Sequence, residues 1–305
     1  MFGGIEGGGT KFNCVLGTGP KDVLAVATFP TADPETTLHA VVDFFQKAGA
    51  GRNLAAVGMA SFGPIDLDVA SPTYGYITST PKAGWQHFNI VGALRERLGV
   101  TIGFDTDVNA AALAEHRWGS ARGVDPVVYL TVGTGIGGGM YVNGAPLHGL
   151  IHPEMGHLVM PAVAGDDFPG VCPYHGRCLE GVASGPALAA RAGKPAQELD
   201  PDDPLWDLEA FYLATAVVDI LYTVSPRRVV LGGGVMDQRH LFPRIHARVM
   251  ALIDGYLPHP AVTASGIASY VVPPELGPRC GMLGAIELAR RALAWTTPVQ
   301  PSSPS

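Results

Sequence analysis

The feature of this sequence that most restricts its fold is a strand–turn–strand unit that occurs twice. The first copy lies near residues 5–16 and has the turn sequence GGGT at residues 7–10. The second copy lies near residues 127–142 and has the turn sequence GTG at residues 133–135. Apolar runs separated by short glycine-rich segments are typical of β-hairpins. Their repetition indicates a duplicated lobe.

Helical segments alternate with further strands along the chain. The first helix has clear end signals, because Asp33 can cap it, Pro34 suits its first turn and Gly49 can end it. Apolar spacing predicts helices at residues 34–48, 90–98, 108–118, 186–192, 205–224, 242–256 and 282–295, and strands at residues 2–6, 11–16, 23–29, 54–60, 101–104, 127–132, 137–141 and 228–231. This interleaving predicts an α/β fold.

The chain is long and apolar enough for two lobes, with 305 residues of which 47% are hydrophobic. We expect a small N-terminal lobe at residues 1–107, joined by the helix at residues 282–296, and a large lobe at residues 108–281. The large lobe contains an irregular segment, residues 151–181, rich in His, Cys, Gly and Pro. Residues 297–305 are punctuated by proline and predict a flexible tail.

Charge and hydropathy exclude several classes of protein. Only 15% of residues are charged and the formal net charge is −7, which disfavours binding to nucleic acid or to an anionic membrane. No apolar run approaches the roughly 20 residues of a transmembrane helix, and the N-terminus lacks the pattern of a signal peptide. We therefore expect a cytoplasmic protein that binds neither nucleic acid nor a membrane.

Three glycine clusters follow apolar strands, at residues 7–9, 133–139 and 232–234. Without side chains, backbone N–H groups can approach an anion closely. Each cluster alone is more often a tight turn, but three together, two of them with a threonine, favour nucleotide phosphates. None matches the P-loop, and the second leads into a strand rather than the helix of a dinucleotide-binding fingerprint.

Polar residues after two other strands are further candidates. Asp107 lies between a strand and a helix, where the positive helix end favours a carboxylate that could accept a proton from a substrate hydroxyl. An N-cap for the helix at Val108 is an equally good interpretation. Ser61 follows a buried strand and marks either a turn or a contact to a polar ligand.

The most specific local pattern is a set of metal-ligating residues in the irregular segment. Cys172, His175 and Cys178 lie within seven residues, and His157 could supply a fourth ligand. Two thiolates and two imidazoles suit tetrahedral Zn²⁺, and four protein ligands indicate a structural site. Free thiols beside a chance histidine are the alternative. His152 is one more candidate ligand, but an exposed loop histidine is the favoured interpretation and the one we predict.

Together these motifs resemble the ROK family (repressor, open reading frame, kinase), specifically its bacterial fructokinase branch. The resemblance runs from the GIEGGGTK sequence at residues 4–11 to the GMLGA sequence at residues 281–285. It implies the two-lobed, actin-like (ribonuclease H-like) ATPase fold of sugar kinases. It also implies ATP-dependent transfer of phosphate to the 6-hydroxyl of a hexose, with D-fructose the first choice and mannose or glucose as alternatives.

The resemblance assigns roles to individual residues. It makes Asp107 the catalytic base. ATP binding falls to residues of the three glycine clusters: Gly8, Gly9, Thr10, Lys11, Gly133, Thr134, Gly135, Gly232, Gly233 and Gly234. Sugar binding falls to Ser61, Glu154, His157 and Glu180, and structural zinc to His157, Cys172, His175 and Cys178. Magnesium is expected to accompany ATP in a cleft between the lobes, and we expect a homodimer.

Three positions depart from the usual family pattern. Glu6 stands where most members have Asp, Thr106 where most have Asn, and His175 where most have a third zinc-loop Cys. These departures point away from a typical glucokinase. A sugar-responsive ROK repressor is a less favoured alternative, because repressors carry an additional N-terminal DNA-binding domain and this chain starts at the first phosphate-loop strand.

Overall fold

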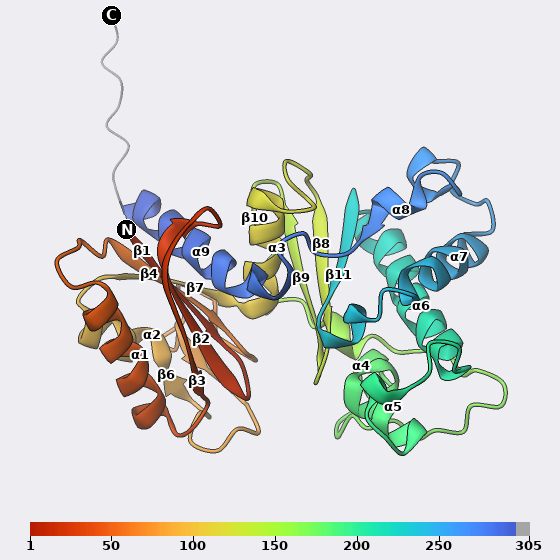
Figure 1. Ribbon diagram of the computed structural model, residues 1–305, viewed down its shortest axis with the longest axis horizontal. Coiled ribbons are helices and arrows are strands. Elements are labelled where there is room, and N and C mark those ends of the chain that lie inside the picture. The colour runs from red at the N-terminus through yellow and green to blue at the C-terminus, as the bar shows by residue number, and fades with distance from the viewer. Residues whose placement is uncertain (297–305) are drawn as a thin grey trace, which may run out of the picture. The chain divides into compact units, whose positions relative to one another are not determined.

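The computed structural model describes residues 1–296 and consists of two compact units, each built on a five-stranded sheet (Figure 1). Of the described residues, unit 1 contains Met1–Ala114, His148–His152 and 279–296, and unit 2 contains Glu115–Leu147 and Pro153–Pro278. The division falls inside a helix, not at residue 107, and the short segment His148–His152 belongs to unit 1. The predicted tail, residues 297–305, lies outside the described residues.

The two sheets have the same topology. In unit 1 the strand order is β3-β2-β1-β4-β7, with β1 antiparallel to β2, β2 antiparallel to β3, and β1, β4 and β7 parallel. In unit 2 the order is β10-β9-β8-β11-β12, with the same directions. The duplication predicted from the two glycine turns is therefore confirmed.

The strand bounds follow the predictions closely for the long strands. They are β1 (Phe2–Gly7), β2 (Lys11–Gly19), β3 (Asp22–Pro30), β4 (Ala56–Ser61), β7 (Thr101–Thr106), β8 (Val127–Val132), β9 (Ile136–Val142) and β11 (Arg228–Gly232). Four two-residue strands were not predicted, because two residues show no periodicity: β5 (Tyr76–Ile77), β6 (Phe88–Asn89), β10 (Ala145–Pro146) and β12 (Val271–Val272).

The predicted helices are also present. They are α1 (Pro34–Ala48), α2 (Ile90–Leu98), α3 (Asp107–Trp118), α5 (Gly185–Ala192), α6 (Leu205–Val224), α7 (Leu241–Ile253) and α9 (Cys280–Thr296), to which the structure adds the short α4 (Leu179–Ala183) and α8 (Ile267–Tyr270). Asp33 caps α1 as predicted, by accepting a hydrogen bond from the amide of Thr36. Helix α7 ends before residue 256 because Asp254 and Gly255 both adopt left-handed conformations.

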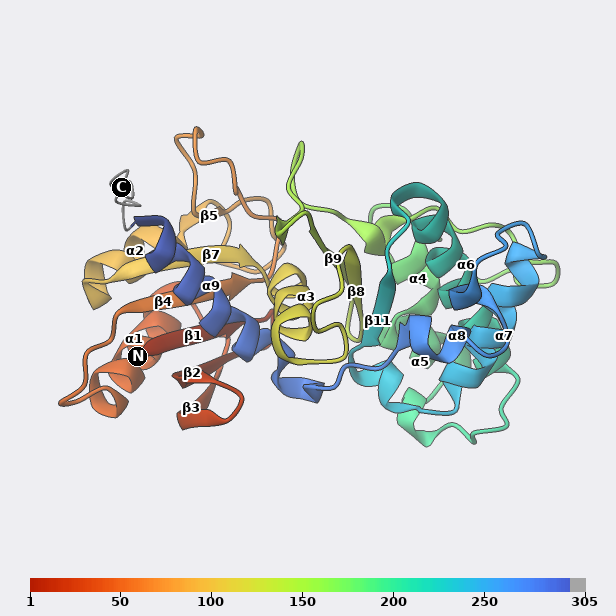
Figure 2. The same cartoon turned by 90° about the horizontal axis from the view of Figure 1, so that it is seen from above.

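Helix α9 lies almost directly on the backbone of the unit 1 sheet. Figure 2 shows it crossing β1, β4 and β7, strands that lie far from it in the sequence. Gly4, Gly58 and Gly103 form one register row across these three strands. A Cβ atom at these positions would approach α9 backbone atoms to 2.7, 1.8 and 2.4 Å, respectively. The glycine row therefore allows a contact between helix and sheet that no side chain would permit.

The opposite face of the same sheet is covered by α1. Neighbouring residues of a strand point to opposite faces, and a Cβ atom at Gly3 would meet the Phe45 ring of α1, whereas one at Gly4 meets α9. Unit 1 is thus a sheet between helices, and its core includes the fully buried Phe12 and Trp85. The core of unit 2 is centred on α6, which packs on α4, α5 and α7.

Among residues 1–296, no helix combines the length and apolar character needed to cross a bilayer.

Candidate active site and metal centre

Three parallel strands of unit 1 end side by side and carry candidate site residues. Gly7, Ser61 and Thr106, the last residues of β1, β4 and β7, lie in one register row. Because neighbouring strands are about 4.8 Å apart, the backbones at the two outer positions are separated by roughly 10 Å. The glycine turn after β1 and Asp107 after β7 therefore leave the sheet at the same edge.

The glycine turn after β1 is held in shape by hydrogen bonds on its own backbone. The Gly8 amide donates to the Lys11 carbonyl at 2.9 Å, and Thr31 donates through its hydroxyl to the Gly8 carbonyl at 2.7 Å and through its amide to the Thr10 carbonyl at 2.9 Å. Thr31 was not among the predicted site residues. Its position opposite this turn comes from the β2–β3 pairing, which no local pattern in the sequence reveals.

Glu6, which lies beside this turn on β1, has a raised pKa. Burial raises the pKa of its carboxyl group, against the smaller opposing effects of a hydrogen bond from Asn13 and the nearby charge of Lys11. A Cβ atom at Gly281 would lie 2.1 Å from a carboxylate oxygen of Glu6. Glu6 therefore occupies the space left by the glycine at the start of α9.

Asp107 is the first residue of α3, and its neighbour caps the helix. The Thr106 hydroxyl accepts a hydrogen bond from the Asn109 amide at 3.1 Å, so Thr106 is the N-cap. The alternative that Asp107 is the cap is therefore wrong. An oxygen of Asp107 accepts from the Val108 amide at 2.9 Å, and the residue is partly exposed. Its carboxylate lies at the positive end of the helix, as the sequence predicted.

The turn before Asp107 is held by a buried carboxylate that the sequence analysis did not single out. Asp105 accepts hydrogen bonds from the Thr106 amide and the Asn109 side chain, both at 2.8 Å, and contacts Nε2 of His148 at 2.9 Å. This hydrogen bond with Asp105 raises the pKa of His148. His148 lies 43 residues away in the sequence, so only tertiary structure brings the pair together.

Two further residues of unit 1 are buried. Ser61 is fully buried and its hydroxyl donates to the Phe62 carbonyl at 2.8 Å. The prediction that His152 is exposed is wrong, since only 5% of its surface is accessible. Its Nε2 atom accepts from the Ile65 amide at 3.3 Å. Together with His148, this contact explains why residues 148–152 belong to unit 1.

The other two glycine clusters lie next to each other in unit 2. Strands β8 and β11 are adjacent and parallel, with Gly232 opposite Thr131, so the loops that follow them are neighbours. Gly233 has φ of +89°, and a Cβ atom there would lie 2.4 Å from the Val132 carbonyl oxygen, so this position requires glycine. The Gly133 carbonyl accepts from the amide of Gly185 at the start of α5.

The predicted sugar-binding carboxylates both lie near the second glycine cluster. Glu180 accepts a hydrogen bond from the Ile136 amide at 2.9 Å. A Cβ atom at Gly135 would lie 2.6 Å from the same Glu180 oxygen, so a larger residue there would displace the Glu180 carboxylate. Burial raises the pKa of Glu154, and repulsion from the nearby charge of Glu180 raises it further by a smaller amount. The two carboxylates therefore act on one another electrostatically.

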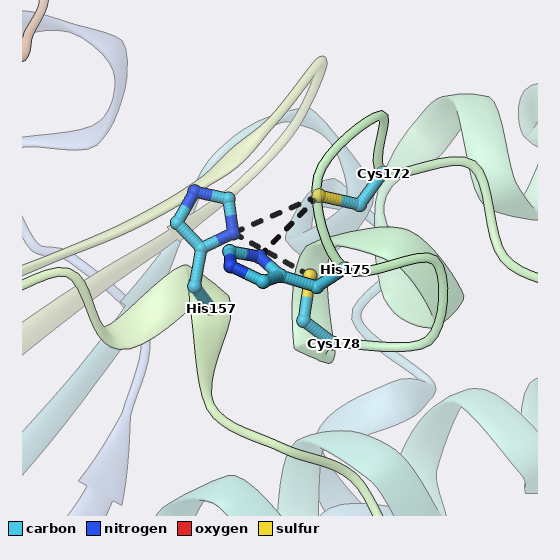
Figure 3. A group of neighbouring side chains, drawn as sticks. All are labelled: His157, Cys172, His175 and Cys178. Carbon is cyan, nitrogen blue, oxygen red and sulfur yellow. Dashed lines mark hydrogen bonds between the residues drawn. The ribbon is translucent and has the colours of Figure 1, made fainter.

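The four predicted metal ligands converge, as Figure 3 shows. Their ligand atoms all lie within 4.8 Å of one another, and three of the pairs are separated by 3.4 Å (His157 Nδ1 to Cys178 Sγ), 3.8 Å (Cys172 Sγ to His175 Nδ1) and 3.9 Å (Cys172 Sγ to His157 Nδ1). Zinc bonds of about 2.0–2.3 Å in a tetrahedron place ligand atoms roughly 3.3–3.8 Å apart. The group could therefore hold such an ion with little rearrangement.

The metal-ligand group joins two short helices that carry the candidate sugar residues. His157 ends the 3₁₀ turn Met155–His157, directly after Glu154, and Cys178 precedes α4, which contains Glu180. The Leu179 amide donates to the Leu158 carbonyl at 2.9 Å, and Val159 forms a β-bridge with Cys178. A metal bound here would therefore fix Glu154 relative to Glu180.

A second network, which the sequence analysis missed, anchors the irregular segment to α5 and α6. Asp166 accepts two hydrogen bonds from Arg191, at 2.6 and 2.9 Å, one from the Tyr212 hydroxyl at 2.5 Å and one from Arg177 at 3.1 Å. The Arg191 hydrogen bonds are the main reason that the pKa of Asp166 is far below its usual range. The residues come from distant parts of the chain, so their pairing leaves no sequence signature.

Comparison with known proteins agrees with the fold. A solved ROK hexokinase from Thermus thermophilus superposes with a TM-score of 0.76 and 28% identity, covering 96% of this chain and 99% of that one. The fold is accordingly the actin-like ATPase fold of sugar kinases.

The particular family is defined by sequence. The ROK family profile matches residues 2–292. A fructokinase from Zymomonas mobilis is 43% identical, covering 96% of this chain and 97% of the relative. A fructokinase from Streptococcus mutans is 40% identical, covering 96% and 99%. The chain belongs to the ROK family.

Proposed function

We propose that this protein is an ATP-dependent fructokinase, which converts D-fructose and ATP to fructose 6-phosphate and ADP. The relatives named fructokinase, at 40–43% identity over nearly the whole chain, support the substrate. The register row that ends at Gly7, Ser61 and Thr106 supports the reaction. It sets a glycine turn suited to phosphate roughly 10 Å from Asp107, enough room for a phosphoryl group and the hydroxyl that attacks it.

Asp107 is the general base in this proposal. Its carboxylate accepts the proton of the sugar's primary hydroxyl while the oxygen forms a bond to the γ-phosphorus and the bond to ADP breaks. The Thr106 cap and the Asp105 hydrogen bonds hold the start of α3, so little reorganisation is needed. Magnesium enters with ATP as the MgATP substrate and neutralises phosphate charge.

The remaining binding roles are assigned to residues of the three glycine-rich loops and to residues in and beside the two short helices. ATP phosphates and the adenosine side are assigned to the glycine-rich loops after β1, β8 and β11. The sugar is assigned to Ser61, Glu154, His157 and Glu180. The mutual repulsion of Glu154 and Glu180 supports this assignment, because two nearby carboxylates need hydrogen-bond donors such as sugar hydroxyls. The homodimer and the cytoplasmic location stay predictions.

The metal group is proposed to hold one structural Zn²⁺. Two thiolates and two imidazoles within tetrahedral reach support zinc over magnesium or calcium, which prefer oxygen ligands. Zinc would have a structural role and cross-link the segment before α4. It would take no part in catalysis, since four protein ligands leave no position for a reacting water.

The test is a coupled assay of ADP release with fructose, mannose, glucose and N-acetylated hexoses. We expect fructose to give the highest kcat/KM, and Asp107→Asn to lower kcat by about 10³-fold with ATP affinity nearly unchanged. Asp43→Asn is the matched control, because Asp43 forms an ion pair with Lys47 on the surface of α1, away from the glycine turn. No ADP release with fructose, or near-normal turnover by Asp107→Asn, would contradict the proposal.

A further inference from the structure

We propose that Lys82 is a further substrate-binding residue, whose ammonium group binds the phosphoryl group of ATP that is transferred. This inference rests on the proposed function. Lys82 was not among the sequence-predicted site residues. Its Nζ atom lies 2.5 Å from the carbonyl oxygen of Gly9, in the glycine turn after β1, 73 residues away in the sequence.

The turn is arranged to receive an anion. The carbonyl oxygens of residues 8–10 each have a donor: the Thr31 hydroxyl for Gly8, Lys82 for Gly9 and the Thr31 amide for Thr10. Within residues 1–296, no hydrogen bond is made by the amides of Gly9 or Thr10, and both residues are exposed. The oxygens that would repel phosphate are thus engaged, while two amides remain available to bind it.

The segment that carries Lys82 packs on β2, the strand that follows the glycine turn. The Trp85 amide donates to the Lys82 carbonyl at 3.1 Å, and the Trp85 indole donates to the Ala32 carbonyl at 2.8 Å. The Trp85 ring is fully buried and stacks on Phe12 of β2 at a centroid distance of 5.3 Å. Since Phe12 follows the turn by two residues, the backbone of Lys82 is held in place relative to it.

Lys82 has no anionic partner of its own. In the part of the chain that the structure describes, it forms no ion pair, and its partner at Gly9 is a neutral carbonyl. An ammonium group has three N–H donors, so Lys82 can bind a phosphate oxygen, a stronger acceptor than a carbonyl, while it keeps its hydrogen bond to Gly9. Lys11, the other cation at this turn, acts on the Glu6 carboxyl group. Lys82 is therefore a second cation at this turn, besides Lys11, that is available for substrate phosphate.

The position of Lys82 indicates which phosphate group of ATP it binds, namely the one that is transferred. The glycine turn and Asp107 leave the same sheet edge, and in the proposed reaction the γ-phosphoryl group must lie between the turn and the hydroxyl held by Asp107. Kinases generally place a lysine or arginine on this group, because charge develops there during transfer. Lys82 should thus distinguish ATP from ADP.

The experiment measures Kd values by calorimetry for the magnesium complexes of ADP and of the non-hydrolysable β,γ-imido analogue of ATP. The variants are Lys82→Met, Lys82→Arg and, as a control, Lys21→Met, which alters an exposed lysine in the β2–β3 turn of the same unit. We expect Lys82→Met to weaken the ATP analogue by about tenfold and ADP by less than twofold. Lys82→Arg should restore most of the loss, and Lys21→Met should change neither affinity.

Two results would overturn the inference. If Lys82→Met binds the ATP analogue as tightly as the wild type, Lys82 does not contact the terminal phosphate. If it weakens ADP and the analogue equally, Lys82 only supports the loop through Gly9. Neither result depends on the sugar, so a wild-type protein that binds nucleotide but phosphorylates no hexose would refute the proposed function while the affinities still decide the role of Lys82.

Discussion

Replacing Gly58 by alanine should destabilise unit 1 severely, because the added methyl group meets backbone rather than a movable side chain. Its Cβ atom would lie 1.8 Å from the Ala285 carbonyl oxygen and 2.9 Å from the Ala289 amide nitrogen of α9. Ordinary contacts need about 3.4 Å or more, so α9 would have to move by roughly 1.6 Å. Such a shift would also open the contacts of α9 with Gly4 and Gly103.

The magnitude follows from the loss of this packing. Overpacking alone costs about 1–3 kcal/mol, and separating a helix from a sheet by more than 1 Å forfeits a large part of their dispersion energy. We therefore expect Gly58→Ala to lower the free energy of unfolding by about 3 kcal/mol or more, and Tm by roughly 6–12 °C.

The assay is urea denaturation followed by circular dichroism, with hydrogen exchange to locate the loss in unit 1. Gly149→Ala serves as the control, because a Cβ atom at Gly149 meets nothing closer than the Ile151 carbonyl oxygen at 3.9 Å. If Gly58→Ala unfolds at the same urea concentration as the wild type, the argument from the glycine row is refuted.

Two further changes test other parts of the molecule. Cys178→Ser should remove zinc, as measured by elemental analysis, and raise the sugar KM by about tenfold with little effect on ATP affinity. The control Cys280→Ser, at another buried thiol, should retain the metal. Fully active wild-type enzyme without zinc would exclude the site. His148→Gln should reduce the pH dependence of stability. Because the pKa of His148 is raised in the folded protein, its protonated form stabilises the fold fully below about pH 6.5. This contribution, under about 1 kcal/mol, is lost as the pH rises through the raised pKa. Identical urea midpoints for the variant and the wild type from pH 6 to pH 9 would contradict that assignment.

The elements of the fold could be predicted from the sequence where local chemistry determines them. The Asp33 cap, the bounds of α2 and α6, and the two glycine turns all depend on residues close together in the chain. The metal group was also predictable, because three of its ligands lie within seven residues and thiolates with imidazoles are rarely juxtaposed without a metal.

The supporting residues of the site could not be predicted, because they come from distant segments. Lys82 reaches Gly9, His148 reaches Asp105, and Arg191 reaches Asp166 across 73, 43 and 25 residues, respectively. Nothing near any of these residues distinguishes it from an ordinary surface charge. Asp107 shows the intermediate case: its place between strand and helix was predicted, but the local pattern could not show that Thr106, not Asp107, caps α3.

The glycine row also determines when unit 1 can finish folding on the ribosome. Strands β1, β4 and β7 emerge early, but the helix that covers their glycine-lined face is translated only after all of unit 2. Domains usually complete folding in order from the N-terminus; here the second unit can close first, and the first waits with one sheet face exposed. Ribosome stalling, or a stop codon, before residue 280 would release a chain whose first sheet has no cover on that face, which makes it a ready substrate for chaperones and proteases.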